Sequence, residues 1–260
     1  MSKSSVIEIN SSMLEKNISF LRDHFGDDVI FSSVVKGNAY GHGIGIVVPI
    51  IKSCGIDHFS VFNSDEARQV HNAVDNHTRI MIMGYIADED YEWILENEIE
   101  FFLWDLYRAR KAMDAAKSTG KQAIIHIEVE TGMNRTGITF DELKKLVSLI
   151  KENPGIFRLK GLCTHYAGAE SIANYVRVKN QIELFNDTYD WLVEQELKPE
   201  LRHTACSAAA MTYPETRMDM MRIGILQYGF WPSRETFIHY IHNREKKKDP
   251  LKRVIKWTTR

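Results

Sequence analysis

A regular alternation of short apolar segments with longer amphipathic ones constrains the fold of this chain most strongly. Helical periodicity is expected near residues 11–24, 44–53, 64–74, 88–97, 106–118, 140–151 and 174–195. Between these stretches lie strand candidates at Val29–Val35, Phe59–Val61, Arg79–Met83, Glu100–Leu103, Ile124–Val129, Arg158–Cys163, Leu201–His203 and Met220–Arg222. Repeated βα units indicate a parallel sheet, and eight of them predict an α/β fold of the (β/α)8 TIM barrel type.

An open, doubly wound sheet is the alternative built from the same βα units. Sheets of that kind that bind dinucleotides carry a G-x-G-x-x-G turn after the first strand. The glycines that follow the first strand here, Gly41, Gly43 and Gly45, do not have that spacing. The barrel is therefore the favoured fold, and in a barrel the reactive side chains lie at the carboxyl ends of the strands.

The stretch VVKGNAYGHG, residues 34–43, places a lysine at the end of the first strand. Because Lys36 follows a largely apolar run, we expect its ammonium group to be desolvated and its pKa to be lowered, which makes the amine nucleophilic toward a carbonyl. The glycines after it allow a tight turn, and Tyr40 brings a hydroxyl group to the same rim. The alternative is a lysine that extends into solvent beside an ordinary loop.

Further polar residues follow the later strands. They are Arg135 after the fifth strand, His165 after the sixth, His203 and Ser207 after the seventh, and Arg222 with Gly224 after the eighth. An arginine at this edge can bind a carboxylate or a phenolic oxygen, and a glycine lets backbone approach a ligand closely. The structural alternatives are a surface ion pair for the arginine, a buried network for the histidine and a helix cap for the serine.

Composition limits the possible partners. A formal net charge of −2 and 44% hydrophobic residues indicate a globular protein with no electrostatic attraction to nucleic acid or acidic membranes. The three cysteines have no CxxC spacing, so neither a disulfide framework nor a metal site is expected. No apolar run resembles a signal peptide or a membrane span, and a cytoplasmic location is the expectation.

The stretch VVKGNAYGHG resembles the pyridoxal 5′-phosphate lysine motif of bacterial alanine racemases. HIEVETGMNRTG, CTHYAGAE, RHTACSAAAM and MRIGILQYG resemble the same family in order and spacing. The resemblance implies a fold-type III enzyme, an isomerase that converts L-alanine to D-alanine for peptidoglycan. Lys36 would form the internal aldimine with pyridoxal phosphate and act as one of two acid/base groups.

The resemblance also implies a role for each strand-end residue. Cofactor contacts would come from Tyr40, Ser207, Gly224 and Ile225 at the phosphate, Arg135 at the phenolic oxygen and near the substrate, His165 against the ring, Arg222 at the pyridine nitrogen, and His203 and Tyr228 nearby. An arginine is always protonated, so it donates a hydrogen bond to the pyridine nitrogen without transferring a proton. Such a ring is a weaker electron sink, which favours proton removal and return at Cα over transamination.

Two positions depart from the family pattern. Many of these racemases have a carbamylated lysine seven residues before the motif arginine, whereas this chain has Glu128. A permanent carboxylate would supply the same negative charge and orient Arg135. Cys206 stands where the family usually has asparagine.

Residues 1–240 are expected to form the barrel domain, with residues 1–10 pairing with a second, β-rich domain. Residues 241–260 resemble a linker and the first strand of that domain. In the family the second domain supplies a tyrosine base across a homodimer, so the chain is expected to be a fragment without that base. The basic residues in 244–253 read as a solvated linker rather than a nucleic-acid surface, because no aromatic platform accompanies them.

Two other functions use related barrels. A stand-alone pyridoxal-phosphate protein of cofactor homeostasis is one alternative, although such proteins lack NAYGHG. Another fold-type III enzyme, such as a decarboxylase or a D-amino-acid lyase, is the second. A decarboxylase would need an acidic partner at the pyridine nitrogen where this chain has Arg222, and the lyase would need late metal ligands.

Overall fold

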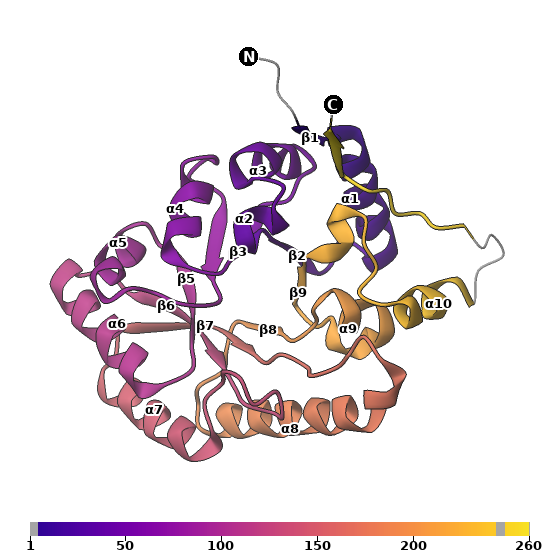
Figure 1. The fold of residues 1–260 in the computed structure, drawn as a ribbon. Helices are drawn as coiled ribbons and strands as arrows, with labels where there is room; N and C mark the ends of the chain where they lie inside the picture. The colour runs from indigo at the N-terminus through magenta and orange to yellow at the C-terminus, as the bar shows by residue number, and fades with distance from the viewer. Residues whose placement is uncertain (1–4, 243–247, 260) are drawn as a thin grey trace.

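The computed structural model describes residues 5–242 and 248–259, and its centre is a ring of eight parallel strands (Figure 1). The strands are β2 (Ile30–Val34), β3 (His58–Val61), β4 (Arg79–Ile82), β5 (Glu100–Leu103), β6 (Ala123–Glu128), β7 (Phe157–Cys163), β8 (Leu201–His203) and β9 (Met220–Ile223). Every predicted strand is present, and its ends agree within one residue. The prediction of an eight-stranded βα barrel is confirmed.

Helices surround the ring, as the sequence periodicity predicts (Figure 1). They are α1 (Ser11–Phe25), α3 (Ile44–Ser53), α4 (Ser64–His71), α5 (Tyr91–Glu96), α6 (Leu106–Thr119), α7 (Phe140–Glu152), α8 (Tyr175–Glu194), α9 (Ser207–Thr212) and α10 (Arg234–His242). Side-chain caps start several of them; for example, Asn10 accepts a hydrogen bond from Met13 N–H at 3.0 Å. Helix α10 was not predicted from the sequence, and α4 ends three residues earlier than expected.

The ring has a seam between β8 and β9. All other neighbouring strands are joined by parallel ladders, in the order β8-β7-β6-β5-β4-β3-β2-β9, and the β6·β7 ladder shifts its register between Ile125 and His126. Across the seam the described residues form one isolated bridge between Cys206 and Arg222, in which Arg222 N–H donates to the Ala205 carbonyl at 3.0 Å. Lower down, Asp219 N–H donates to the Arg202 carbonyl at 3.1 Å. The barrel is therefore nearly closed rather than fully laddered.

Apolar packing holds the helices against the outside of the ring, while the inside is partly polar. Leu14, Ile18 and Leu21 of α1, for example, are fully buried. The inward residues include a small apolar cluster of Met81, Phe102, Cys163 and Met220. Beside it lie buried polar side chains, Ser32, His58, Ser60, Glu100, His126 and His203. Burial of such groups requires that they bond to one another.

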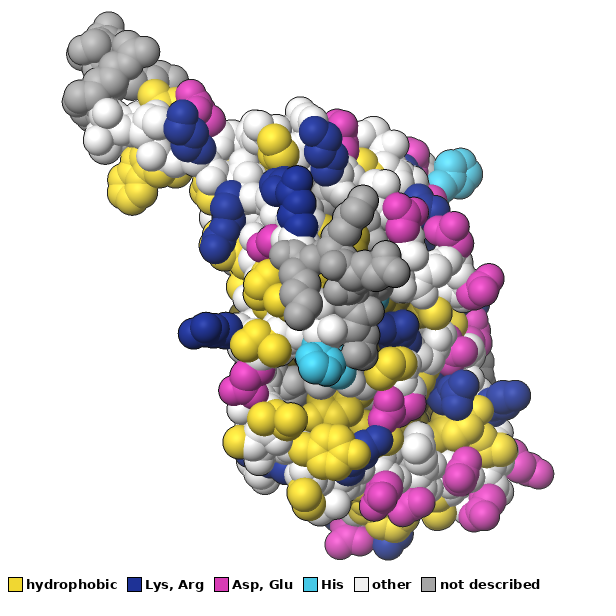
Figure 2. All heavy atoms as spheres, turned by 90° about the vertical axis from the view of Figure 1, so that its right-hand side faces the viewer, with side chains coloured by type: hydrophobic (Ala, Val, Ile, Leu, Met, Phe, Trp, Pro, Cys, Tyr) yellow, Lys and Arg dark blue, Asp and Glu magenta, His cyan; other side chains and the backbone are white. Residues whose placement is uncertain are grey.

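A two-stranded ribbon stands outside the barrel. β1 (Ser5–Ile9) pairs antiparallel with β10 (Ile255–Thr259), and the ribbon projects from the body of the molecule (Figures 1 and 2). Two of its large apolar side chains are exposed to solvent, Ile7 at 56% and Trp257 at 73%. No helix in the described ranges is both long and apolar enough to cross a membrane.

The segment that leads to β10 packs on the barrel, where the sequence suggested a solvated linker. Asn17 of α1 bonds to both backbone groups of Lys252, at 2.7 and 2.8 Å. The Arg253 guanidinium stacks on Phe230 at 3.6 Å from the ring centroid. Gly229 permits this docking, because a Cβ there would lie 1.9 Å from the Lys252 carbonyl oxygen. Residues 244–247 of the basic stretch lie outside the described residues.

Candidate active site

Lys36 begins a short left-handed turn at the end of β2. The turn, α2 (Lys36–Tyr40), has positive φ angles of 63° at Gly37, 51° at Asn38, 56° at Ala39 and 54° at Tyr40. Left-handed backbone costs a non-glycine residue on the order of 1 kcal/mol, so surrounding contacts must hold this turn in place. The turn ends at Gly41, which also has a positive φ. Lys36 lies at the mouth of the barrel because it closely follows the carboxyl end of β2.

The environment lowers the pKa of Lys36, as the sequence analysis expected. Partial burial is the main cause, and the positive charges of Arg135 and Arg222 add to it, while Cys206 and Glu66 act in the opposite direction. The side chain is nevertheless accessible at the mouth rather than enclosed in a dry interior. A cationic cluster with an accessible amine suits an anionic ligand that carries a carbonyl group.

Tyr40, Ser207 and Gly224 meet on one side of the mouth. The Ser207 hydroxyl accepts a hydrogen bond from Gly224 N–H at 3.0 Å. A Cβ on Gly224 would lie 2.3 Å from the Tyr40 hydroxyl oxygen, so only glycine allows this approach. Burial raises the pKa of Tyr40 to about 12 and keeps its hydroxyl protonated as a donor. Ile225 follows at the start of a 3-10 helix, η4 (Ile225–Tyr228).

Tyr228 lies beneath this group and supports it. Its ring packs against those of Tyr40 and His42, with centroids 5.3 and 4.3 Å away. Its hydroxyl donates to the Val34 carbonyl at 3.3 Å, and the ring is 1% exposed. Tyr228 therefore fixes the Tyr40 ring from below.

Arg222 is buried at the centre of the mouth. Its terminal nitrogens donate to the Nδ1 and carbonyl oxygen of His203 and to the carbonyls of Thr164, at 2.7 Å, and Thr204, at 3.4 Å. These four bonds use the four terminal N–H groups and leave the Nε–H for a ligand. A guanidinium held in this way is a fixed donor.

A chain of hydrogen bonds continues from Arg222 down the inside of the barrel. Because Arg222 only donates, His203 accepts at Nδ1 and carries its proton on Nε2. His203 then donates to Nδ1 of His126 at 2.7 Å, and His126 donates from Nε2 to Glu100 at 2.8 Å. His58 lies 3.3 Å from the same carboxylate oxygen.

The donor and acceptor directions in this series of hydrogen bonds determine which of its groups carry protons. Burial is the first cause that lowers the pKa of both His126 and His203, so both rings are neutral. Hydrogen bonds from His126 and His58 outweigh the effect of burial and hold the pKa of Glu100 well below its usual range. His203, which the sequence analysis placed at the cofactor, is fully buried behind Arg222 and has both ring nitrogens engaged with protein.

His165 and Arg135 face the same mouth from the loops after β7 and β6. Burial, with the charges of Arg222, Arg135 and Lys36, lowers the pKa of His165 to about 3, so its ring is neutral. Arg135 is exposed and follows a turn in which Glu130 accepts from Asn134 N–H at 2.9 Å. An exposed arginine beside a neutral ring is free to bind a ligand oxygen.

Glu128 is buried at the end of β6, and its Oε2 has no hydrogen-bond partner. Burial raises its pKa, while Thr136 and the charges of Arg222 and Arg135 oppose that effect. Among the ion pairs of the described residues, none within 4.0 Å joins Glu128 to Arg135. The structure thus places the two charges in the same mouth without a direct contact.

Four buried polar residues of the barrel were not predicted from the sequence: Glu66, Glu100, Arg108 and His126. Arg108 is 5% exposed, stacks on Trp104 and has one unpartnered terminal nitrogen, Nη2. Glu100 and His126 occupy inward positions of otherwise apolar strands, EFFL and AIIHIE. Charged residues in such strands were the signal for a buried network.

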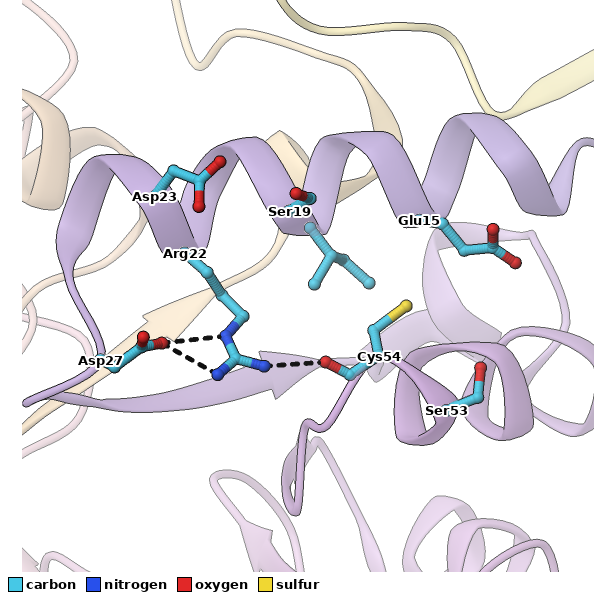
Figure 3. Close-up of a pocket in the computed structure, with 8 residues that line it drawn as sticks. Glu15, Ser19, Arg22, Asp23, Asp27, Ser53 and Cys54 are labelled. Atoms are coloured by element: carbon cyan, nitrogen blue, oxygen red, sulfur yellow. Dashed lines mark hydrogen bonds and ion pairs between the residues drawn. The ribbon is translucent and has the colours of Figure 1, made fainter.

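A separate pocket lies between α1 and the end of α3, away from these residues (Figure 3). There Arg22 donates to the Asp27 carboxylate at 2.9 Å and to the Cys54 carbonyl at 2.9 Å. This side of the barrel carries the amino ends of the strands, where side chains contribute to stability rather than catalysis. It contains none of the candidate residues.

Sequence comparison identifies relatives along most of the chain. The family model "Alanine racemase, N-terminal domain" matches residues 9–232. An alanine racemase of Desulforamulus reducens is 33% identical over 231 residues, which cover 88% of this chain and 61% of the relative. One from Methanococcus maripaludis is 32% identical over 227 residues, or 87% of this chain and 60% of the relative. The chain thus spans less than two thirds of these relatives.

Solved structures have the same architecture. Alanine racemase of Clostridium difficile 630 in complex with cycloserine superposes with a TM-score of 0.88 at 27% identity, covering 100% of this chain and 68% of that one. The Bacillus anthracis enzyme with bound L-Ala-P gives 0.83 at 27% identity, covering 90% and 60%. A Bartonella henselae structure with covalently bound pyridoxal phosphate gives 0.81 at 24% identity over 99% and 69%, and shows the fold alone.

Proposed function

This chain belongs to the alanine racemase family through its N-terminal domain, and from that premise we propose that the barrel mouth binds pyridoxal 5′-phosphate and removes and returns the Cα proton of alanine. The observation that carries the proposal is the meeting of Lys36, with its lowered pKa, and Arg222, with a free Nε–H, at one mouth. When bound, pyridoxal phosphate supplies an electron sink that makes the Cα proton of an amino acid removable.

The residues present fit this cofactor. Lys36, Arg135 and Arg222 give the mouth the positive charge that a phosphate and a carboxylate require. We assign the phosphate to Tyr40, Ser207, Gly224 and Ile225, because the cradle at Gly224 would be filled by any Cβ. Tyr228 supports that cradle from below.

Arg222 donates to the pyridine nitrogen in this proposal through Nε–H, the donor that its protein bonds leave available. His203 acts through Arg222 and does not touch the cofactor, because its ring is buried and fully bonded. The uncharged His165 ring lies against the cofactor ring. Since Arg222 does not give up a proton, the site favours proton return to Cα.

Lys36 takes the Cα proton on one face of the substrate, and its lowered pKa makes the neutral amine available for that step. Arg135 binds the substrate carboxylate or the phenolic oxygen. We propose that Glu128 supplies the negative charge that faces Arg135, as a carbamylated lysine does elsewhere in the family. Oε2 of Glu128 has no protein partner and is available for that interaction.

We propose that the second acid/base is a tyrosine from a β-rich domain that begins with the β1·β10 ribbon, supplied across a homodimer. A two-stranded ribbon has marginal stability alone, and its exposed Ile7 and Trp257 side chains support burial by further structure. Sedimentation of a longer gene product tests the dimer.

The proposed setting is the cytoplasm, where D-alanine would serve peptidoglycan synthesis. All three cysteines are free thiols, which suits a reducing compartment. Export of the protein to an oxidising compartment, detected by cell fractionation, would contradict this assignment.

Borohydride reduction with pyridoxal phosphate, followed by peptide mass analysis, tests the cofactor assignment. We expect one phosphopyridoxyl group on Lys36 and none on exposed lysines such as Lys144. A K36R variant should lose it, and the matched K144R variant should not. Scattered labelling of the native chain would refute the assignment.

Hydrogen exchange at Cα tests the chemistry. Because Lys36 faces one side of the substrate, the loaded chain in D₂O should exchange the Cα hydrogen of one alanine enantiomer at least tenfold faster than that of the other. Proton NMR measures the exchange. Equal exchange of the two enantiomers, or exchange of neither, would contradict the role of Lys36 as the base.

A further inference from the structure

Glu66 connects the loop after β3 to the turn that carries Lys36. It lies in the first turn of α4, and its side chain is buried at 9% exposure. One carboxylate oxygen accepts from Asn38 N–H at 3.0 Å, and the other accepts from Phe62 N–H at 2.8 Å. The carboxylate therefore joins the left-handed turn to the loop after β3, although Asn38 lies 28 positions before Glu66 in the chain.

The bond to Asn38 falls inside the left-handed turn. Asn38 has a φ of 51°, a strained conformation that persists only when neighbours impose it. Its side chain is also engaged, because Oδ1 accepts from Ile44 N–H at 2.9 Å. The turn is thus anchored on one side by α3 and on the other by Glu66. Lys36 lies two residues before Asn38, so the same anchors determine its position.

Glu66 also brings a negative charge toward Lys36. The nearby cations Arg135 and Arg222 lower the pKa of Lys36, and Glu66 is one of the two groups that raise it. The carboxylate that fixes the backbone therefore also limits how far Arg135 and Arg222 lower the pKa of Lys36.

We propose that Glu66 is a positioning residue for Lys36, because its carboxylate holds the left-handed turn through Asn38 N–H and ties it to the β3 loop through Phe62 N–H. The inference rests on the proposed function in that it takes Lys36 as the cofactor lysine. Without Glu66, two backbone N–H groups lose their acceptors, and the strained turn is free to relax.

The experiment uses E66Q and E66A in the cofactor-free chain. The glutamine keeps one acceptor and turns an NH2 group toward the second N–H, and the alanine removes both acceptors. The matched control is E235Q. Glu235 likewise lies in a first helical turn and accepts from a backbone N–H outside its own helix, that of Ile172, at 2.6 Å. Competitive acetylation across pH, with peptide mass analysis, gives the titration of Lys36, and deuterium exchange gives the protection of peptide 36–43.

We expect E66Q to shift the Lys36 titration to lower pH and E66A to raise deuterium exchange of peptide 36–43 at least tenfold. Neither change should appear in E235Q. Pyridoxal phosphate trapping at Lys36 should fall in both Glu66 variants, with unfolding midpoints recorded as a control for folding. If E66A does not fold, E66Q alone still decides the question.

An unchanged Lys36 titration together with unchanged exchange of peptide 36–43 would overturn the proposal. If both change but the native chain never traps pyridoxal phosphate at Lys36, the proposed function fails while the positioning role stands. The acetylation and exchange measurements need no cofactor, so the two failures are distinguishable.

Discussion

The neutral histidines inside the barrel predict a steep loss of stability in mild acid. His126 and His203 are fully buried, and the direction of their hydrogen bonds requires one proton on each ring. A second proton on His203 would remove the acceptor of Arg222. In the unfolded chain the same rings are free to take up a proton with a pKa of about 6.5.

The sign and size of the effect follow from linkage. Because folding lowers the pKa of each ring, its contribution to stability is present above the unfolded pKa and is lost as pH falls from there toward the folded pKa. For a ring that stays neutral when folded, going from pH 7 to pH 5 costs about 1.9 kcal/mol. Burial holds the pKa of His203 well below its usual range, so this ring meets the condition. The two rings together cost up to about 4 kcal/mol, a large part of the stability of a typical domain.

Urea unfolding of the cofactor-free chain at pH 7, 6 and 5 measures this loss. The informative variant is H126Q, because a glutamine accepts from His203 through its oxygen and donates to Glu100 through its nitrogen without titrating in this range. We expect H126Q to lose about 2 kcal/mol less than the native chain between pH 7 and pH 5. The control H239Q changes an exposed ring and should follow the native chain. Equal losses in H126Q and the native chain, within about 0.5 kcal/mol, would refute the reasoning.

Three further substitutions test the site and its support. G224A should weaken pyridoxal phosphate binding at least tenfold in a fluorescence titration, because the new Cβ meets the Tyr40 hydroxyl at 2.3 Å; native affinity would contradict the cradle. E128Q should leave the free energy of unfolding unchanged or raise it, since it removes a buried charge. It should weaken cofactor binding several-fold, because Arg135 loses its facing anion; calorimetric titration measures the affinity, and a native value would reject the role. G229A should lower the free energy of unfolding by about 3 kcal/mol, because the new Cβ meets backbone at 1.9 Å and the φ is 86°; a native denaturation midpoint would exclude the packing described here.

The sequence predicted the barrel well because short, mainly apolar strand segments alternate regularly with amphipathic helical ones. The lysine position and its lowered pKa also followed from local pattern, since Lys36 ends such a segment. The resemblance supplied the remaining roles, which no pattern of spacing would give. His203 is the instructive case: the sequence places it at a strand end, but one residue's difference in register decides whether it faces a ligand or lies behind Arg222.

The features that escaped prediction depend on contacts between distant residues. The left-handed turn was read only as a tight turn, because its conformation requires Glu66, 28 positions after Asn38. Glu100 and His126 are polar residues in otherwise apolar strands, and the hydrogen bond between them forms only when the two strands lie side by side. The helix α10 has few buried residues, only Thr236 among those described, and so lacks the periodic apolar face on which helix prediction depends.

The seam between β8 and β9 makes one strand junction of the barrel mechanically weaker than the other seven. Seven of the eight strand junctions are laddered, and the eighth has only two backbone hydrogen bonds among the described residues, from Arg222 to Ala205 at the upper rim and from Asp219 to Arg202 lower down. Under a pulling force, we expect β8 and β9 to separate before any other pair of neighbouring strands. Arg222, which bonds across this junction, is also the residue proposed to contact the pyridine nitrogen. A bound cofactor would therefore stabilise the junction. We expect the force that separates β8 from β9 to be higher when the site is occupied.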